Sequence, residues 1–171
     1  MNEKAQAVRL MIFDVDGVMT DGGLHYSDSG EEIKVFNSRD GHGIKVLKAS
    51  GVKLAIITGR TSNALARRAA QFNVDYLYQG VEDKLAVFKG ILADAGLTPE
   101  DCGYMGDDVV DLPVMRRVAF AVAVPDAPEL VRQHAHYVTG LPGGRGAVRE
   151  VCDLIMQAQG TLDASLAPYL L

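Results

Sequence analysis

The feature that most constrains this chain is a regular alternation between short runs rich in branched apolar residues and longer segments with helical periodicity. Six strand-like runs follow one another, at residues 9–15, 53–57, 75–78, 103–105, 118–122 and 137–138. Three segments place apolar residues at the spacing of a helix with one buried face, at residues 62–72, 81–95 and 146–158. This alternation predicts an α/β fold, with a Rossmann-like parallel sheet flanked by helices.

One segment departs from the alternation. Residues 23–27 and 31–36 are both strand-like, and they flank the sequence Asp28-Ser29-Gly30. A glycine-containing turn between two such runs predicts a β-hairpin. Because this hairpin follows the first strand directly, we expect it to project over the carboxyl edge of the sheet, where ligands bind in open α/β folds.

Size and composition narrow the classes of protein. The length of 171 residues favours one domain, and the net charge of −5 argues against a nucleic-acid partner. No apolar run approaches the roughly 20 residues that a membrane span needs, and the first residues lack the pattern of a signal peptide. Cys102 and Cys152 have no second Cys or His at metal-ligand spacing, which is typical of buried thiols in a reducing compartment. We therefore expect a cytoplasmic protein with no membrane partner.

The last residues, 160–171, form a separate region after the expected domain at 1–159. This region contains Pro168 and ends in Tyr169-Leu170-Leu171. It is either a frayed terminus or an apolar arm that docks on a neighbouring subunit.

Two acidic residues come at the end of the first strand-like run. Asp14 and Asp16 are separated by one residue, so on an extended chain their carboxylates point to the same side. Two like charges this close are unfavourable unless a cation lies between them or one is protonated, and oxygen ligands suit a hard cation such as Mg²⁺. Taken alone, such a pair also fits a turn or a helix cap.

Polar residues follow the second and third runs as well. Thr58-Gly59-Arg60 offers a hydroxyl and free backbone N–H groups, which suit a phosphoryl oxygen but also an ordinary helix start. Lys84 lies at the start of the next helix, where its charge opposes the helix dipole. Such a misfit occurs on plain surfaces, and it also occurs where a cation must face an anion.

A second acidic cluster follows the fourth run. Asp107, Asp108 and Asp111 can complete a metal site begun by the first acidic pair, or they can cap the following helix. Each of these segments is ambiguous alone, but all of them fall at or just after predicted carboxyl ends of strands. Their joint order along one edge favours a metal-assisted phosphoryl site.

With these residues in place, the sequence resembles the haloacid dehalogenase-like phosphatase superfamily. Asp14-Val15-Asp16-Gly17-Val18 looks like its first motif, Thr58 like the second, Lys84 like the third and residues 106–111 like the fourth. Within the superfamily, the chain is similar from end to end to the 3-deoxy-D-manno-octulosonate 8-phosphate phosphatases. That closer similarity is carried by residues 14–22, 39–44, 57–60, 77–80 and 143–159. One departure is Ser38, where we expect valine, and it affects only fine positioning beside the pocket.

The resemblance implies a Mg²⁺-dependent enzyme of lipopolysaccharide precursor biosynthesis that works through an aspartyl-phosphate. Asp14 would be the nucleophile, and Asp16 would be the general acid and base. Thr58 and Lys84 would stabilise the phosphoryl oxygens. The implied metal ligands are Asp14, the backbone carbonyl of Asp16 and Asp107, while Asp108 and Asp111 would orient Lys84 or metal-bound waters.

The resemblance also implies an acidic sugar phosphate as substrate. Its expected binding residues are Asp16, Asn37, Ser38, Arg39, Asp40, Gly41, Lys45, Thr58, Gly59, Arg60, Arg68 and Lys84. The gap between Asp14 and Thr58 holds a hairpin and a helix, and the gap from Thr58 to Lys84 holds a helix and a short strand. Neither leaves space for a lid domain. Capless relatives form homotetramers in which neighbouring hairpins and tails cover the site.

Three other interpretations remain at this point. The first is a phosphatase of a nine-carbon sialic-acid-type sugar 9-phosphate, whose site motifs would be the same. The second is a receiver-like phospho-switch module, although the second run ends in Thr58-Gly59-Arg60 and offers no phosphorylated aspartate there. The third is a catalytically inactive binding module, against which the intact acidic residues and Lys84 argue.

Overall fold

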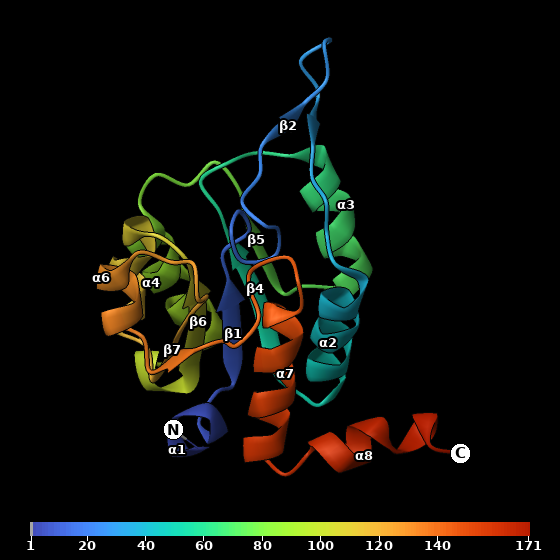
Figure 1. Cartoon of the computed structure of the whole chain (residues 1–171). Helices are drawn as coiled ribbons and strands as arrows, with labels where there is room; N and C mark the ends of the chain where they lie inside the picture. The colour runs from blue at the N-terminus through green and yellow to red at the C-terminus, as the bar shows by residue number, and fades with distance from the viewer. Residues whose placement is uncertain (1) are drawn as a thin grey trace.

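The computed structural model of the protein describes residues 2–171. Its centre is a six-stranded parallel sheet with the strand order β5-β4-β1-β6-β7-β8 (Figure 1). The strands are β1 (Leu10–Phe13), β4 (Lys53–Ile57), β5 (Tyr76–Tyr78), β6 (Cys102–Gly106), β7 (Phe120–Ala123) and β8 (Tyr137–Val138). The predicted fold class is therefore confirmed, and the runs at 53–57 and 137–138 match their strands at both ends.

Helices cover both faces of the sheet. One face carries α2 (Ser38–Ala49), α3 (Asn63–Phe72) and α7 (Ala147–Ala158), and the other carries α4 (Lys84–Ala95) and α6 (Glu129–Gln133) (Figure 1). The remaining elements are α1 (Asn2–Gln6), α5 (Leu112–Met115), α8 (Leu162–Leu166) and the 3-10 turns η1 (Pro99–Asp101), η2 (Val109–Asp111) and η3 (Ala167–Tyr169). Within residues 2–171 the longest helices have 12 residues, and none of the helices qualifies as a membrane span.

β1 lies inside the sheet and is buried on both faces. All residues of Leu10–Phe13 are buried, which explains why the run is continuously apolar and does not alternate. The strand ends at Phe13, earlier than the predicted end at residue 15. Asp14 and Asp16 therefore lie in the turn after the strand and not on an extended run.

The start of α4 also differs from the prediction. The helix expected at 81–95 begins at Lys84, because the Asp83 side chain accepts a hydrogen bond of 3.0 Å from the backbone N–H of Ala86 and caps the helix there. Residues 81–83 are left in the loop that leads from β5. Lys84 is consequently the first helical residue, at the carboxyl edge of the sheet.

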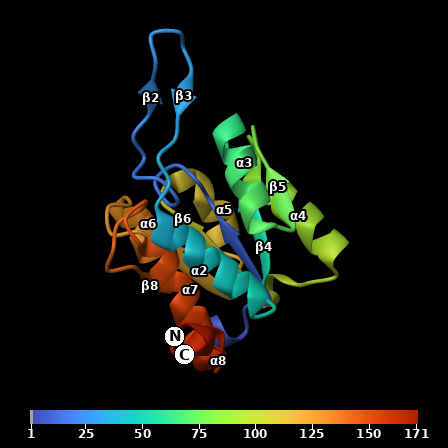
Figure 2. The same cartoon turned by 90° about the vertical axis from the view of Figure 1, so that its right-hand side faces the viewer.

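The predicted hairpin is present and stands clear of the body of the molecule (Figure 2). Its strands, β2 (His25–Tyr26) and β3 (Glu32–Ile33), are shorter than the predicted runs. Tyr26, Ile33 and Val35 are each more than half exposed, at 57%, 54% and 63%. Such a short two-stranded ribbon is marginal by itself, so its position depends on side chains at its base.

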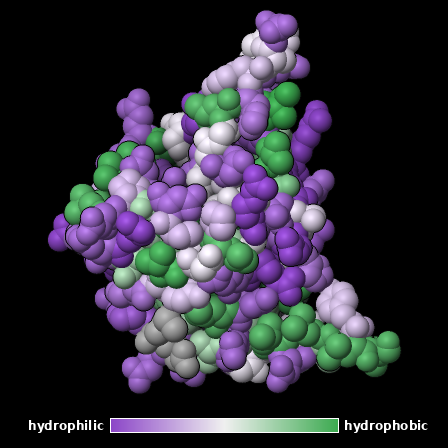
Figure 3. All heavy atoms as spheres, viewed as in Figure 1, coloured by the Kyte–Doolittle hydropathy of each residue, from purple (hydrophilic) through white to green (hydrophobic). Residues whose placement is uncertain are grey.

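The C-terminal region is helical, which the sequence reasoning did not anticipate. It forms α8 and η3, and the ring of Tyr169 lies edge-on to that of His42 in α2, with centroids 5.3 Å apart. Leu170 and Leu171 are almost fully exposed. Figure 3 shows an apolar surface running along this projecting end of the chain.

Candidate active site

A cavity of about 580 Å³ opens at the carboxyl edge of the sheet. The turn after β1, the ends of β4 and β6, and the start of α4 all contribute to its wall. Its chemically active lining consists of Asp14, Asp16, Thr58, Arg60, Lys84 and Asp107. The structure thus brings together the four segments whose polar residues stood out in the sequence.

Lys84 is a buried cation in this cavity and pairs with two carboxylates. Its Nζ lies 2.9 Å from Asp14 Oδ1 and 2.7 Å from Asp111 Oδ1, and its side chain is only 5% exposed. Burial alone would lower the pKa of Lys84, but the charges of Asp14 and Asp111 outweigh burial and raise it. The lysine is therefore a fixed cation beside the Asp14 carboxylate.

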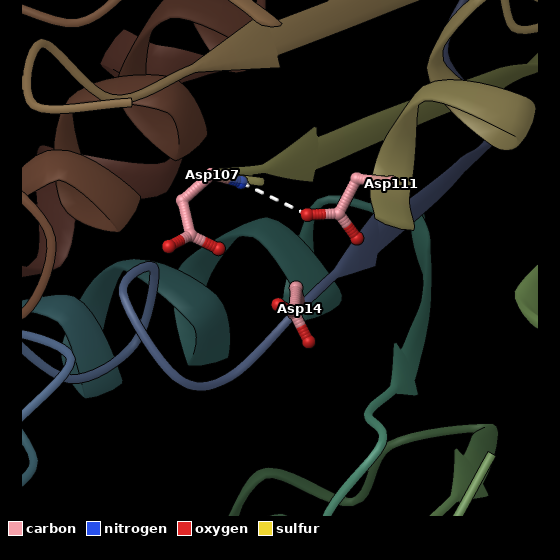
Figure 4. Close-up of side chains that lie close together, drawn as sticks. All are labelled: Asp14, Asp107 and Asp111. Carbon is pink, nitrogen blue, oxygen red and sulfur yellow. Dashed lines mark hydrogen bonds between the residues drawn. The ribbon is translucent and has the colours of Figure 1, made fainter. Parts of the chain in front are cut away.

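Asp111 holds that lysine in place. Its Oδ1 also accepts a hydrogen bond of 2.7 Å from the Tyr104 hydroxyl, and its Oδ2 accepts from the backbone N–H groups of Asp107 and Asp108 at 3.0 and 3.2 Å. Both oxygens are thus occupied, and the residue is fully buried. Figure 4 shows its position beside Asp14 and Asp107.

The carboxylates in the cavity are crowded. Burial, followed by the charge of Asp111, raises the pKa of Asp14 to about 6, although Lys84 acts in the opposite direction. Burial, together with the charges of Asp14 and Asp111, raises the pKa of Asp107 to about 8. Three carboxyl groups thus lie close together with one ammonium paired to two of them, and the surplus negative charge is the kind that a bound cation offsets.

The donor set fits a hard divalent cation. One carboxylate oxygen from each of Asp14, Asp107 and Asp111 lies within 4.8 Å of the others. Because both oxygens of Asp111 already accept hydrogen bonds, Asp14 and Asp107 are the side chains free to bind a metal. Gly17 lies beneath them with a φ of +86°, and a Cβ there would come within 2.0 Å of Asp107 Oδ2. Only glycine allows this approach.

Asp16 faces a different set of partners. Its Oδ1 is 2.5 Å from Nζ of Lys34, which belongs to the returning arm of the hairpin just after β3. Arg60, in the loop after β4, donates to Glu32 Oε2 at 2.6 Å and to the hydroxyl of Tyr26. Lys34 and Glu32 were missed by the sequence reasoning, because no spacing rule connects the hairpin to the turn after β1.

The other catalytic candidates occupy the loops around the cavity. Thr58 is buried, and its backbone N–H donates to the carbonyl of Tyr78 at 3.0 Å, which fixes the end of β4. Gly59 also lines the cavity. Asp108 reaches the rim, but its Oδ1 accepts a hydrogen bond of 2.7 Å from the backbone N–H of Val109 and caps η2.

Most of the residues expected to bind the sugar do not line this cavity in the single chain. Those outside it are Asn37, Ser38, Arg39, Asp40, Gly41, Lys45 and Arg68. Asn37 caps α2, and the buried Asp40 accepts a hydrogen bond of 2.9 Å from the backbone N–H of Arg149 in α7. Arg68 stacks over the ring of Phe72, with 4.5 Å between its Cζ and the ring centroid.

The glycine pair after β8 has a structural role that sequence spacing alone did not explain. A Cβ on Gly143 would lie 1.8 Å from the backbone oxygen of Gly17. The backbone N–H of Gly144 donates to the carbonyl of Val18 at 3.0 Å. The loop before α7 therefore packs directly on the turn that carries Asp14 and Asp16.

The fold and the site together define a phosphatase of the haloacid dehalogenase-like superfamily. Among residues 2–171, no cap domain interrupts the sheet, and the hairpin projects from the body of the molecule (Figure 2). No family model matches the chain. A curated relative, the 3-deoxy-D-manno-octulosonate 8-phosphate phosphatase of Escherichia coli strain K12, is 49% identical over 160 residues, which cover 94% of this chain and 85% of the relative.

Solved structures agree with that relative. The 3-deoxy-D-manno-octulosonate 8-phosphate phosphatase of Yersinia pestis is 50% identical, with a TM-score of 0.93 over 95% of this chain and 88% of that chain. The enzyme of the same name from Moraxella catarrhalis, solved with magnesium, phosphate and the KDO molecule, is 42% identical. Its TM-score is 0.96 over 98% of this chain and 97% of that chain. The protein belongs to the 3-deoxy-D-manno-octulosonate 8-phosphate phosphatase family.

Proposed function

We propose that this protein hydrolyses 3-deoxy-D-manno-octulosonate 8-phosphate to the free sugar acid and inorganic phosphate, and so supplies a precursor of lipopolysaccharide. The observation that carries the proposal is the placement of Lys84 Nζ between Asp14 and Asp111, with Asp107 beside them, at one edge of the sheet. The family to which the chain belongs gives the substrate, and this arrangement of groups gives the chemistry.

Asp14 is the nucleophile of the first step. A carboxylate oxygen forms a bond to phosphorus in line with the bond that breaks to the sugar oxygen, and this gives an aspartyl-phosphate. The departing sugar oxygen takes a proton from Asp16, which lines the same cavity. Lys84 and Thr58 donate hydrogen bonds to the phosphoryl oxygens and so stabilise the negative charge on these oxygens in the transition state.

The second step reverses the role of Asp16. Water attacks the aspartyl-phosphate, and the ionised Asp16 takes the proton that the water loses. The bond between phosphorus and Asp14 breaks, so inorganic phosphate leaves and the Asp14 carboxylate is restored. Asp111 acts only through Lys84, because its own oxygens are engaged by Lys84, Tyr104 and two backbone N–H groups.

Mg²⁺ is the cation that this donor set suits. Asp14, Asp107 and the backbone carbonyl of Asp16 would hold it. When bound, it neutralises part of the negative charge that the substrate phosphate brings to a site already crowded with carboxylates. The raised pKa values of Asp14 and Asp107 support this, because burial first and the neighbouring carboxylates second disfavour their ionised forms, and a bound cation offsets both effects.

The sugar end of the substrate is completed by neighbouring subunits in this proposal. Arg60 lines the cavity and is the basic side chain best placed for the substrate carboxylate, whereas Lys45 and Arg68 are not in the cavity wall of one chain. We propose a homotetramer in which the exposed apolar hairpin and the tail at 160–171 meet other subunits. The expected cytoplasmic location stays a prediction, to which the two free, buried cysteines lend support.

A phosphate-release panel tests the proposed substrate. Purified protein would be assayed with and without Mg²⁺ against eight-carbon and nine-carbon acidic sugar phosphates. Glucose 6-phosphate, whose sugar has no carboxylate, is the control. We expect the highest kcat/KM with the eight-carbon acid and no turnover after the metal is chelated. A higher kcat/KM with a nine-carbon sugar 9-phosphate would transfer the assignment to that substrate class. A stable aspartyl-phosphate without turnover would instead favour the receiver-like module.

A further inference from the structure

Four charged residues form a closed ring at the base of the hairpin. Lys34 Nζ lies 2.5 Å from Asp16 Oδ1 and 2.7 Å from Glu32 Oε1. Arg60 Nη2 lies 2.6 Å from Glu32 Oε2, and Arg60 Nε is 4.0 Å from Asp16 Oδ2. The ring contains two cations and two anions, so its charges balance within the chain.

Lys34 is the most enclosed member of this ring. Its side chain is 4% exposed, compared with 21% for Asp16 and 38% for Arg60. A buried ammonium is unfavourable unless it is paired, so the pairs with Asp16 and Glu32 fix where Lys34 can lie. Because the hairpin has only two short strands, these pairs also fix the base of the hairpin over the cavity.

The two oxygens of Asp16 are used differently. Oδ1 is held by Lys34. Within the described residues Oδ2 accepts no hydrogen bond, and the nearest cationic nitrogen, Arg60 Nε, lies beyond hydrogen-bond distance. A carboxylate anchored by one oxygen keeps its side-chain torsions fixed while the other oxygen stays available to a reacting atom.

We propose that Lys34 is a positioning residue for the reaction: it anchors Asp16 through Oδ1, so that Oδ2 meets the leaving sugar oxygen and, later, the attacking water. This inference rests on the proposed function, in which Asp16 transfers the protons. It adds a residue from the hairpin to the machinery and gives the hairpin a role inside its own subunit. Lys34 touches neither the substrate nor the reacting atoms and acts through Asp16.

The test compares two substrates that differ in their need for a proton donor. A sugar alkoxide is a poor leaving group and requires protonation, whereas 4-nitrophenolate is a stable anion and does not. The quantity measured is kcat/KM, which reports only the steps up to departure of the leaving group and excludes the later water step. The variants are Lys34→Met, Asp16→Asn and the double variant, each assayed with both substrates.

We expect Lys34→Met to lower kcat/KM for the eight-carbon sugar phosphate by about 10- to 100-fold, because proton transfer contributes roughly 10²- to 10⁴-fold in such reactions. For 4-nitrophenyl phosphate we expect a change of less than about threefold, which also demonstrates that the variant is folded. The double variant should be no slower than Asp16→Asn alone, because Lys34 acts only through that carboxylate.

Lys48→Met is the matched control. Lys48 Nζ forms an ion pair of the same 2.5 Å length with Asp75, away from the cavity, and its removal should leave both substrates unaffected. Equal losses with the two substrates after Lys34→Met, or a further loss in the double variant, would overturn the positioning role. If Asp16→Asn lowered kcat/KM equally for the sugar phosphate and for 4-nitrophenyl phosphate, Asp16 would not be the proton donor. The positioning role of Lys34 would then be refuted together with the proposed role of Asp16.

Discussion

The two ends of the active-site cavity differ in how completely one chain builds them. At the phosphoryl end, Asp14, Lys84 and Asp111 are buried, and Lys84 pairs with both carboxylates. At the sugar end, Arg60 is joined by a hairpin of two short strands whose apolar side chains are exposed. Of the residues expected to recognise the sugar, seven lie outside the cavity wall.

This difference separates chemistry from recognition. Phosphoryl transfer needs groups held to within a fraction of an ångström, and buried strand ends provide that rigidity. Recognition of a particular sugar can be assembled later, from loops and from other subunits, since it depends on which contacts are added around a fixed phosphate site. Substitutions at the phosphoryl end should therefore affect every substrate alike, whereas changes at the sugar end should affect the acidic sugar phosphate alone.

The largest effect is expected from Asp14→Asn. The amide cannot attack phosphorus, so kcat/KM should fall by at least about 10⁴-fold with both the sugar phosphate and 4-nitrophenyl phosphate. Phosphate release by stopped assay measures this, and mass spectrometry of acid-quenched protein should find no aspartyl-phosphate. Turnover near the unmodified rate with either substrate would refute the nucleophile assignment.

A smaller but equally unselective loss is expected from Lys84→Met. Removal of a buried donor to developing negative charge costs about 10²- to 10³-fold, and the loss should be the same for both substrates. Lys89→Met, on the exposed side of the same helix, is the matched control and should keep full activity with both substrates. A loss confined to the sugar phosphate would assign Lys84 to recognition and break the division between the two ends.

The phosphoryl end was also the part that the sequence predicted best. Asp14, Thr58 and Asp107 follow the largely buried inner strands β1, β4 and β6, whose apolar runs are easily recognised. Lys84 follows the less buried edge strand β5, and its position was predicted from the helix that begins there. All four residues line the cavity at one edge of the sheet. Correct strand positions were therefore enough to predict which residues meet at the site. This held even where a predicted boundary was wrong by a few residues, as at the start of α4.

Contacts between segments without periodicity could not be predicted in this way. Lys34 meets Asp16 only after the hairpin folds back, and Asp40 meets Arg149 across 109 positions of sequence. The helices α5, α6 and α8 have only four or five residues, too few for an amphipathic repeat. These long-range contacts and short helices depend on tertiary packing, which a sequence pattern does not reveal. The contact of Lys34 with Asp16, at the base of the hairpin, belongs to the sugar end.

The next effect concerns the coupling of metal and protons at the phosphoryl end. The raised pKa values, about 6 for Asp14 and about 8 for Asp107, mean that the metal-free site holds protons that Mg²⁺ must displace. Apparent Mg²⁺ affinity should therefore rise with pH between 6 and 8, by up to about tenfold per unit for each proton released. Calorimetry in two buffers of different ionisation enthalpy measures that proton release.

The same groups link stability to pH in the metal-free protein. Their pKa values are higher in the folded state than the ordinary aspartate value of 3.8, so the folded protein binds these protons more tightly than the unfolded chain. Their contribution to stability should accordingly fall as pH rises from about 4 to about 8, and Mg²⁺ should reverse the fall. Asp126→Asn, which removes an exposed acid away from the cavity, should leave both trends intact. A pH-independent Mg²⁺ affinity would contradict them.

The smallest effect, confined like that of Lys34→Met to the sugar phosphate, is expected from removal of residues 160–171. If the tail supplies contacts that contribute about 1 kcal/mol to binding of the sugar in the transition state, its loss lowers kcat/KM for the sugar phosphate about fivefold. The value for 4-nitrophenyl phosphate should stay within about twofold, because no residue of this segment lines the cavity of its own chain.

Mixing subunits determines whose site the tail serves. A full-length Asp14→Asn subunit has a tail but no nucleophile, and a truncated subunit has the nucleophile but no tail. If tails act across a subunit interface, refolding the two together should restore sugar-phosphate turnover per active site toward that of the intact protein. If the tail acts only within its own chain, where Tyr169 already contacts His42, mixing restores nothing. In that case the sugar end, like the phosphoryl end, would be built by one chain, and the contrast between the two ends would disappear.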